Sequence, residues 1–168
     1  MLVGVISDTH DDIDSLERAV ELFQRFGVDE IIHLGDLVSP FTLKPIISSG
    51  IPFRILRGNN DAEALLVTTV LENGGIYYTA PVELELGGLK SLMFHGFGSK
   101  ELTKKVALRM AGSNEYELIL YGHTHDLHLE EINGSLILNP GESSGKLTGR
   151  RTVAILDTIE KEAEIIDL

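Results

Sequence analysis

Seven polar residues that closely follow short apolar runs have side chains of the types that bind divalent metal ions. They offer carboxylate oxygen, imidazole nitrogen and amide oxygen, and the chain has no cysteine to add a thiolate. These donors suit hard or borderline cations such as Mn²⁺, Fe²⁺, Zn²⁺, Ni²⁺ and Mg²⁺. The residues are Asp8, His10, Asp36, Asn59, His95, His123 and His125. Seven ligands are too many for one typical site, but they suffice for two metal ions that share a carboxylate.

The apolar runs in front of these residues are rich in aliphatic or β-branched side chains, which is typical of buried strands. They cover residues 2–6, 30–34, 53–56, 91–94 and 118–121. In open α/β sheets, ligands gather outside the carboxyl ends of the strands. We therefore expect five separate segments to deliver their polar side chains to one edge of the fold.

Glycine accompanies nearly every candidate ligand. The neighbouring glycines are Gly35, Gly58, Gly96 and Gly122. Glycine tolerates a positive φ and lets the backbone turn sharply at a strand end. We expect each of these glycines to turn the chain and so aim the adjacent ligand.

The other elements follow from local patterns. A helix should follow the first strand, because apolar residues recur at helical spacing between positions 13 and 23, with Asp11 or Asp12 as its N-cap and Gly27 as its end. Later the pattern is largely β, with strands at 82–86, 127–132, 135–138, 152–157 and 163–167 and a surface loop at 141–151. The sequence therefore predicts a mixed α/β architecture of two packed sheets.

Length and charge restrict the class of protein. We treat residues 1–168 as a single domain, because this is the usual size of a chain with one core. No apolar run approaches the roughly 20 residues of a membrane helix, and no secretory signal precedes the first strand, so we expect a cytoplasmic location. The net charge of −12 argues against general nucleic-acid binding. An anionic substrate would need local positive charge, which bound divalent metal supplies.

Five short motifs in one order resemble a known family. They are Asp8-Thr9-His10, Gly35-Asp36, Gly58-Asn59-Asn60-Asp61, His95-Gly96 and Gly122-His123-Thr124-His125. This ordered set is similar to that of the calcineurin-like metallophosphoesterases, and the chain most resembles their small, single-domain prokaryotic phosphodiesterases. The resemblance implies a four-layer α/β/β/α sandwich, a small phosphate-ester substrate and, by analogy with small relatives, a homodimer.

The resemblance also implies how two metal ions would be held. The first set of ligands is Asp8, His10, Asp36 and His125. The second set is Asp36, Asn59, His95 and His123, so that Asp36 bridges. Two such ions, Mn²⁺ before Ni²⁺, Zn²⁺, Fe²⁺ or Mg²⁺, would lie roughly 3.5–4 Å apart, clamp the phosphoryl oxygens and lower the pKa of a bridging water, so that hydroxide attacks phosphorus.

One position departs from the family pattern. Many phosphatases of this type carry a His directly after the ligand Asn, whereas this chain has Asn60. Asn is not a useful proton donor to a leaving alkoxide, so we expect diesters to be favoured over monoesters with poor leaving groups. Asp61 is expected to orient Asn60 or the nearby backbone. With Asp36, Asn59 and His95, Asn60 completes the expected catalytic set.

A second departure is Glu142 in Asn139-Pro140-Gly141-Glu142, where relatives often have Ser. Its carboxylate would either repel a substrate phosphate or point away from it. Four basic residues are candidates to offer a positive charge to the substrate phosphate, and the sequence does not choose among them. They are Arg57, Lys146, Arg150 and Arg151.

Two further histidines are interpreted as non-ligands. His33 lies inside the second strand and should be a hydrogen-bonded structural residue, and His128 should pack or face solvent at the start of a hairpin strand. Two other functions remain open beside the phosphodiesterase: a phosphomonoesterase at the same site, and a non-catalytic scaffold, because a eukaryotic trafficking-complex subunit has a similar fold. Every ligand position is filled here, which favours catalysis.

Overall fold

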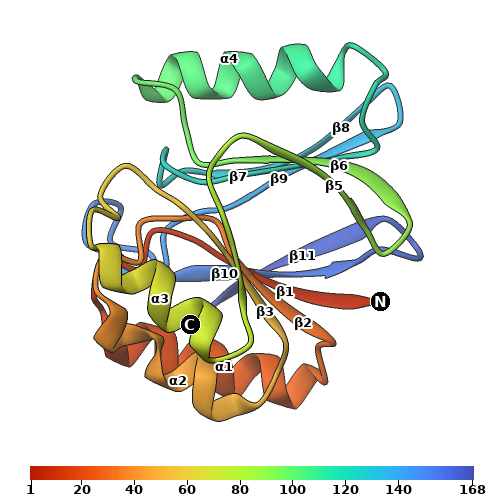
Figure 1. Cartoon of the computed structure of the whole chain (residues 1–168). Coiled ribbons are helices and arrows are strands. Elements are labelled where there is room, and N and C mark those ends of the chain that lie inside the picture. Colours follow the sequence, from red (N-terminus) through yellow and green to blue (C-terminus); the bar gives the residue numbers. More distant parts are fainter.

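Two β-sheets face each other in the computed structural model, which describes residues 1–168 (Figure 1). The first sheet has the strand order β11-β10-β1-β2-β3-β4 and comprises β1 (Leu2–Ile6), β2 (Glu30–His33), β3 (Phe53–Leu56), β4 (Ile76–Tyr78), β10 (Thr152–Asp157) and β11 (Glu162–Asp167). The second sheet has the order β5-β6-β7-β9-β8 and comprises β5 (Val82–Leu86), β6 (Leu89–Phe94), β7 (Leu118–Tyr121), β8 (Leu127–Ile132) and β9 (Ser135–Pro140).

Helices cover the outer face of each sheet. The first sheet is covered by α1 (Ile13–Phe26), α2 (Lys44–Ser49) and α3 (Ala64–Glu72), with the short 3-10 helix η1 (Pro40–Leu43) leading into α2. On the opposite side, α4 (Lys100–Ala111) lies over the second sheet (Figure 1). The expected four-layer α/β/β/α sandwich is therefore confirmed.

Three apolar clusters separate the four layers. The first lies between the first sheet and its helices and includes Leu16 and Phe23 of α1. The second lies between the two sheets, and the third lies under α4. In β7, Leu118 and Leu120 face the other sheet while Ile119 and Tyr121 face α4, as the alternation of side chains along a strand requires. Strands buried on both faces explain the continuous apolar runs in the sequence.

The strands that precede the candidate ligands are parallel within each sheet. In the first sheet, β1 pairs with β2 and β2 with β3 in parallel register. In the second sheet, β6 pairs with β7 in the same manner. Parallel neighbours end on the same side, so the carboxyl ends of β1, β2 and β3 lie together, and so do those of β6 and β7.

Helix α1 begins and ends as its sequence predicts. The side chain of Asp12 accepts a hydrogen bond from the backbone N–H of Ser15 at 3.0 Å, and Gly27 ends the helix in the left-handed conformation with φ of 66°. Three elements were not predicted from the sequence, namely α2, α3 and β4. With six and three residues respectively, α2 and β4 are too short to show a recognisable period. In α3 the apolar residues do not keep to one face, since Leu65 and Leu71 are exposed.

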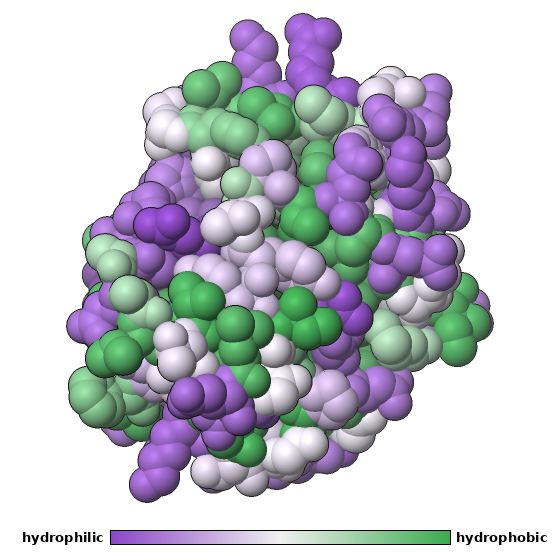
Figure 2. Space-filling view, in the orientation of Figure 1, coloured by the Kyte–Doolittle hydropathy of each residue, from purple (hydrophilic) through white to green (hydrophobic).

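The surface mixes polar and apolar side chains. Figure 2 shows hydrophilic side chains projecting at the top, where α4 lies, and apolar residues interspersed with polar ones over the rest of this face. None of the helices combines the length and the apolar character that crossing a membrane would require.

Candidate metal centre

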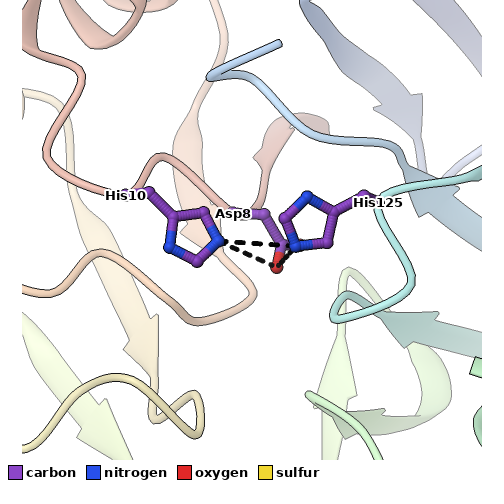
Figure 3. Close-up of side chains that lie close together, drawn as sticks. All are labelled: Asp8, His10 and His125. Carbon is purple, nitrogen blue, oxygen red and sulfur yellow. Dashed lines mark hydrogen bonds and ion pairs between the residues drawn. The ribbon is translucent and has the colours of Figure 1, made fainter. Parts of the chain in front are cut away.

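Three imidazoles surround one carboxylate oxygen where the ends of the two sheets meet. Asp8 Oδ1 lies 3.4 Å from His125 Nε2, 3.9 Å from His10 Nε2 and 4.0 Å from His95 Nε2. The Nε2 atoms of His10 and His125 are 3.4 Å apart, and both rings point toward Asp8 (Figure 3). These side chains come from loops after β1, β6 and β7, so strands of both sheets contribute to one point.

A second carboxylate stands beside the first. Asp36 Oδ2 lies 3.3 Å from His95 Nε2 and 3.7 Å from His10 Nε2. The structure thus brings two groups of metal-binding side chains together, Asp8 with His10 and His125, and Asp8 with Asp36 and His95. Five of the seven predicted ligands are united here, and Asp8 belongs to both groups.

Two buried polar atoms at this point have no hydrogen-bond partner. They are Asp8 Oδ1 and His95 Nε2. A buried polar atom without a partner costs free energy, so such atoms are rare unless a function requires them. Divalent cations bound at this point would satisfy these atoms, and two carboxylates with three imidazoles are suitable donors. The residues therefore fit a metal site.

The other ring nitrogen of two histidines is held by the protein. His95 Nδ1 lies 2.7 Å from the carbonyl oxygen of Leu34, and His125 Nδ1 lies 2.8 Å from Glu142 Oε2. Both partners accept hydrogen bonds, so Nδ1 carries the proton and Nε2 presents its lone pair toward the carboxylates. Metal-binding histidines are commonly oriented in this way.

Burial and charge act against each other at these groups. Burial raises the pKa of Asp8 despite the nearby imidazoles of His95 and His125. Burial also raises the pKa of Asp36, but the nearby His95 imidazole and the hydrogen bonds from Asn60 outweigh it, and the pKa lies well below its usual range. Burial lowers the pKa of His95, yet the two carboxylates raise it more. Asp36 is therefore ionised at neutral pH and available to a cation.

Most of the candidate ligands, rather than the glycines beside them, have a left-handed backbone, which corrects the expectation that the glycines turn the chain. Asp8, His10, Asp36 and His125 have φ of 54°, 44°, 57° and 61°. Only a few per cent of non-glycine residues have positive φ, and such residues cluster at functional sites. Of the four neighbouring glycines only Gly35 has a positive φ, at 105°.

The other three glycines are needed for close approach rather than for turning. A Cβ on Gly58 would lie 2.2 Å from the backbone nitrogen of Asp36, and one on Gly122 would lie 2.2 Å from Ser7 Oγ. A Cβ on Gly96 would lie 2.4 Å from the His123 ring. These contacts join segments that are distant in sequence, so no local pattern could reveal them.

Asn59 and His123 lie beside the cluster and contact each other. His123 Nδ1 is 2.8 Å from Asn59 Oδ1, while its Nε2 is 2.7 Å from the carbonyl oxygen of Gly98. The His123 ring stands edge-on to His95 with 5.2 Å between ring centroids. Neither Asn59 nor His123 belongs to the two close groups, and their role as ligands stays a prediction.

Asn60 and Asp61 hold the Asp36 turn from two sides. The backbone N–H of Asn60 donates to Asp36 Oδ1 at 2.8 Å, and its side-chain amide donates to Oδ2 at 2.7 Å. Asp61 Oδ2 accepts the backbone N–H groups of Asp36 at 3.0 Å and of Gly58 at 2.7 Å. Of the two roles expected for Asp61, it fills the one of orienting the backbone.

Glu142 points away from the open side of the site. It is fully buried, and besides His125 its carboxylate accepts hydrogen bonds from Ser144, Leu147 and Thr148. Burial raises its pKa, but the bonds from Thr148 and His125 lower it more, to about 2. Sequence reasoning missed its contact with a ligand, and the only signal was its unusual place after Pro140-Gly141.

The two histidines interpreted as non-ligands are both buried and hydrogen-bonded. His33 Nδ1 accepts the backbone N–H of Gly35 at 3.1 Å, and its Nε2 lies 3.0 Å from Thr9 Oγ1. The structural role expected for His33 is confirmed. His128 packs rather than facing solvent, with Nδ1 2.6 Å from the Tyr121 hydroxyl.

The four basic candidates are separated by the structure. Lys146 lines a hollow with His10, Asn60 and His125. The other three lie elsewhere: Arg150 pairs with Asp167, Arg151 pairs with Asp12, and Arg57 lines a different hollow with Asp61 and Tyr77.

The chain is similar to known proteins in both sequence and fold. Residues 1–161 match the model of the calcineurin-like phosphoesterase superfamily domain. A phosphodiesterase of Methanocaldococcus jannaschii is 35% identical over 164 residues, which cover 96% of each chain. A solved structure of an archaeal phosphodiesterase superposes with a TM-score of 0.90 at 34% identity, with all of both chains covered. Vacuolar protein sorting 29 of Cryptosporidium parvum has a TM-score of 0.64 at 18% identity, covering 99% of this chain and 96% of that one, and shows only a shared fold.

Proposed function

Because the chain belongs to the calcineurin-like phosphoesterase superfamily, we propose that it is a metal-dependent phosphodiesterase that hydrolyses small phosphate diesters at the site around Asp8 and Asp36. The observation that carries this proposal is the pair of buried atoms without partners, Asp8 Oδ1 and His95 Nε2, among two carboxylates and three imidazoles. The identity to a phosphodiesterase over nearly the whole length supports the choice of reaction.

Two divalent ions are proposed for this site, with Mn²⁺ before Ni²⁺, Zn²⁺, Fe²⁺ and Mg²⁺. The first would be held by Asp8, His10, Asp36 and His125, and the second by Asp36, Asn59, His95 and His123. His123 would exchange one of its two present ring contacts for the second ion. When bound, the ions would supply positive charge to the phosphoryl oxygens and acidify a water molecule.

The residues of the chain supply position and charge. Glu142 and the Leu34 carbonyl fix the rings of His125 and His95, and Asn60 fixes both oxygens of Asp36. Asn60 has no acidic proton, so it cannot protonate a strongly basic leaving group. Expulsion of a good leaving group does not need that proton, so diesters with such groups should be better substrates than monoesters with poor leaving groups.

The proposed function is tested by metal content and hydrolysis in the same preparation. Wild type should bind two Mn²⁺ per chain and cleave bis(p-nitrophenyl) phosphate, and Asp36→Ala should lose metal and at least a hundredfold in kcat. Asp14→Asn, an exposed acidic residue in the first turn of α1, serves as the control and should behave like wild type. Wild type that is loaded with metal but inactive would contradict the proposal and favour a non-catalytic binding protein.

The phosphomonoesterase alternative differs only in substrate. Comparing bis(p-nitrophenyl) phosphate with p-nitrophenyl phosphate at matched Mn²⁺ separates the two, since the leaving group is the same. A clear preference for the monoester would overturn the proposal that the chain is a phosphodiesterase. The scaffold alternative has support from fold alone, because the sorting protein is only 18% identical.

A further inference from the structure

A hollow opens directly beside the candidate metal centre. Its volume is about 320 Å³, and its lining consists of His10, Asn60, His125, Lys146 and Leu147. Small-molecule sites in proteins begin at about this size. Two of the five residues, His10 and His125, are predicted metal ligands, so any molecule in this hollow lies against the metal site. The other contacts come from Asn60 and from one loop.

Lys146 brings the only positive side chain to this hollow. Its ammonium donates to the carbonyl oxygen of His10 at 2.5 Å, which holds it at the metal centre. An ammonium has three N–H donors, so two remain for a ligand. In a chain of net charge −12, an anion approaching this site meets general repulsion. Lys146 is placed where a local positive charge is most useful.

Leu147 exposes an apolar side chain at the same place. It is 70% exposed although it lines the hollow beside Lys146. The backbone of Leu147 is held in place, because its N–H donates to Glu142 Oε1 at 2.9 Å. An apolar side chain held in the open at a site for an anion offers a contact to the organic part of a substrate.

Glu142 ties this loop to a metal ligand. One carboxylate oxygen accepts from the backbone of Leu147 and from Thr148, and the other accepts from the His125 ring. The bond from the Gly149 N–H to the Gly145 carbonyl, at 3.1 Å, closes the loop on itself. The loop and His125 thus share one buried anchor, so Lys146 and Leu147 are positioned relative to the metal centre before any substrate arrives.

We propose that residues 145–149 form the substrate-binding loop of this site, in which the Lys146 ammonium pairs with an oxygen of the substrate phosphate and Leu147 packs on an apolar or aromatic substituent of a diester. This inference rests on the proposed function. It narrows the substrate class to phosphodiesters that carry at least one such substituent, and it assigns the phosphate contact to Lys146 among the four basic candidates.

Binding is tested with two non-chromogenic diesters that differ in their substituents. Diphenyl phosphate and dimethyl phosphate are titrated into Mn²⁺-loaded protein by calorimetry and used as competitive inhibitors of bis(p-nitrophenyl) phosphate hydrolysis. Lys146→Gln should weaken both ligands about five- to tenfold, because each loses the same charged contact. Leu147→Ala should weaken diphenyl phosphate at least threefold and leave dimethyl phosphate unchanged. Metal content should stay at the wild-type value in both variants.

Matched controls lie on the turn between β10 and β11. Lys161 also donates its ammonium to a backbone carbonyl, that of Gly134 at 2.6 Å, and Ile159 is 77% exposed. Lys161→Gln and Ile159→Ala should bind both diesters like wild type. Unchanged binding in Lys146→Gln, or an equal effect of Leu147→Ala on both diesters, would overturn the inference. If wild type binds diphenyl phosphate but hydrolyses no diester, the proposed function fails while the role of the loop is still measured by calorimetry.

Discussion

The backbone N–H of Val38 donates to Asp61 Oδ1 at 2.7 Å, and Val38 has φ of 83°. A β-branched residue with positive φ is a genuine outlier and costs roughly 1–3 kcal/mol, so the surroundings must hold it. Asp61 does this, because its other oxygen also accepts the N–H groups of Asp36 and Gly58. One buried carboxylate therefore fixes the two turns that carry Asp36 and Asn59.

Asp61 should stabilise the fold through these three hydrogen bonds. Asp61→Asn keeps the size of the side chain but turns an NH₂ group toward a backbone N–H and removes the charge. We expect it to lower the free energy of unfolding by about 2–3 kcal/mol in urea denaturation. Asp29 is an exposed matched control, since it accepts the N–H of Leu2 at 2.8 Å, and Asp29→Asn should cost less than about 1 kcal/mol. Equal effects of the two substitutions would refute this role of Asp61.

Metal should stabilise the protein through Asp8. At 100 times its dissociation constant, Mn²⁺ contributes about 2.7 kcal/mol, which raises Tm by about 5–10 °C in a chain of this size. Chelation should reverse the rise. Asp8→Asn should lose nearly all of it, because Oδ1 is the atom that lacks a partner at the imidazoles.

The same substitution should not destabilise the metal-free protein. Burial raises the pKa of Asp8, so its ionised form at neutral pH is unfavourable in the folded state. An asparagine there can still accept from Ser7 and from the His123 N–H. Differential scanning calorimetry with and without Mn²⁺ measures both effects. A metal-free Asp8→Asn protein that is much less stable than wild type would show that Asp8 is a structural residue instead.

Asn60 should determine the choice between diester and monoester. Asn60→His introduces a group able to donate a proton to the leaving oxygen, and general acid catalysis contributes about 10²–10⁴-fold. We expect the ratio of monoester to diester kcat/KM to rise at least tenfold, measured with phenyl phosphate and bis(p-nitrophenyl) phosphate. Asn60→Ala distinguishes this gain from a general loss, since it should lower both activities by freeing Asp36. An unchanged ratio in Asn60→His would argue against the proton-donor explanation.

Glu142 should hold the loop at 145–149 and the His125 ring. In Glu142→Gln the side chain loses its charge, which weakens the hydrogen bond from the Leu147 N–H, and one of its two acceptor oxygens becomes an NH₂ group that faces either that N–H or the His125 ring. We expect amide hydrogen exchange at Leu147 and Thr148 to speed up at least tenfold, which corresponds to about 1.4 kcal/mol. Ser144→Ala, which removes only the 3.0 Å bond to Oε2, is the control and should change exchange little. If exchange at Leu147 and Thr148 were as slow in Glu142→Gln as in wild type, Glu142 would not be what holds the loop.

His33 should make stability depend on pH. Burial is the main cause that lowers the pKa of His33 to about 3, from the ordinary value of about 6.5 that a histidine has in an unfolded chain. Between these values the unfolded chain binds the additional proton, so stability is lost as the pH falls from about 6.5 toward 3, with a slope of up to about 1.4 kcal/mol per pH unit. Above pH 7 the contribution should be constant.

A variant without this titration isolates the effect. His33→Asn keeps an oxygen that can accept the Gly35 N–H and cannot be protonated in this range. The difference in unfolding free energy between wild type and His33→Asn, measured by urea denaturation from pH 7 to 4, should shrink as the pH falls. A difference that is constant with pH would contradict the prediction.

Much of the fold and the chemistry of the site could be predicted from the sequence, because their signals are local. The apolar runs before Asp8 and Asp36 mark buried strands, and Asp12 and Gly27 mark the ends of α1. The donor types at the strand ends specify a cation, whatever their exact geometry. The shortest elements, α2 and β4, were not predicted, because six and three residues are too few to show a periodic pattern.

Only the tertiary structure decided which side chains meet. His10 and His125 are separated by 115 positions, and their Nε2 atoms are 3.4 Å apart. Likewise, Lys146 lies 136 positions from the His10 carbonyl to which it donates. No spacing rule reaches across such distances, because these contacts depend on how two sheets pack through their shared apolar core. The sequence by itself determined the types of metal-binding side chain, while packing determined that Asp8 stands among three imidazoles and that Lys146 lines the hollow beside them.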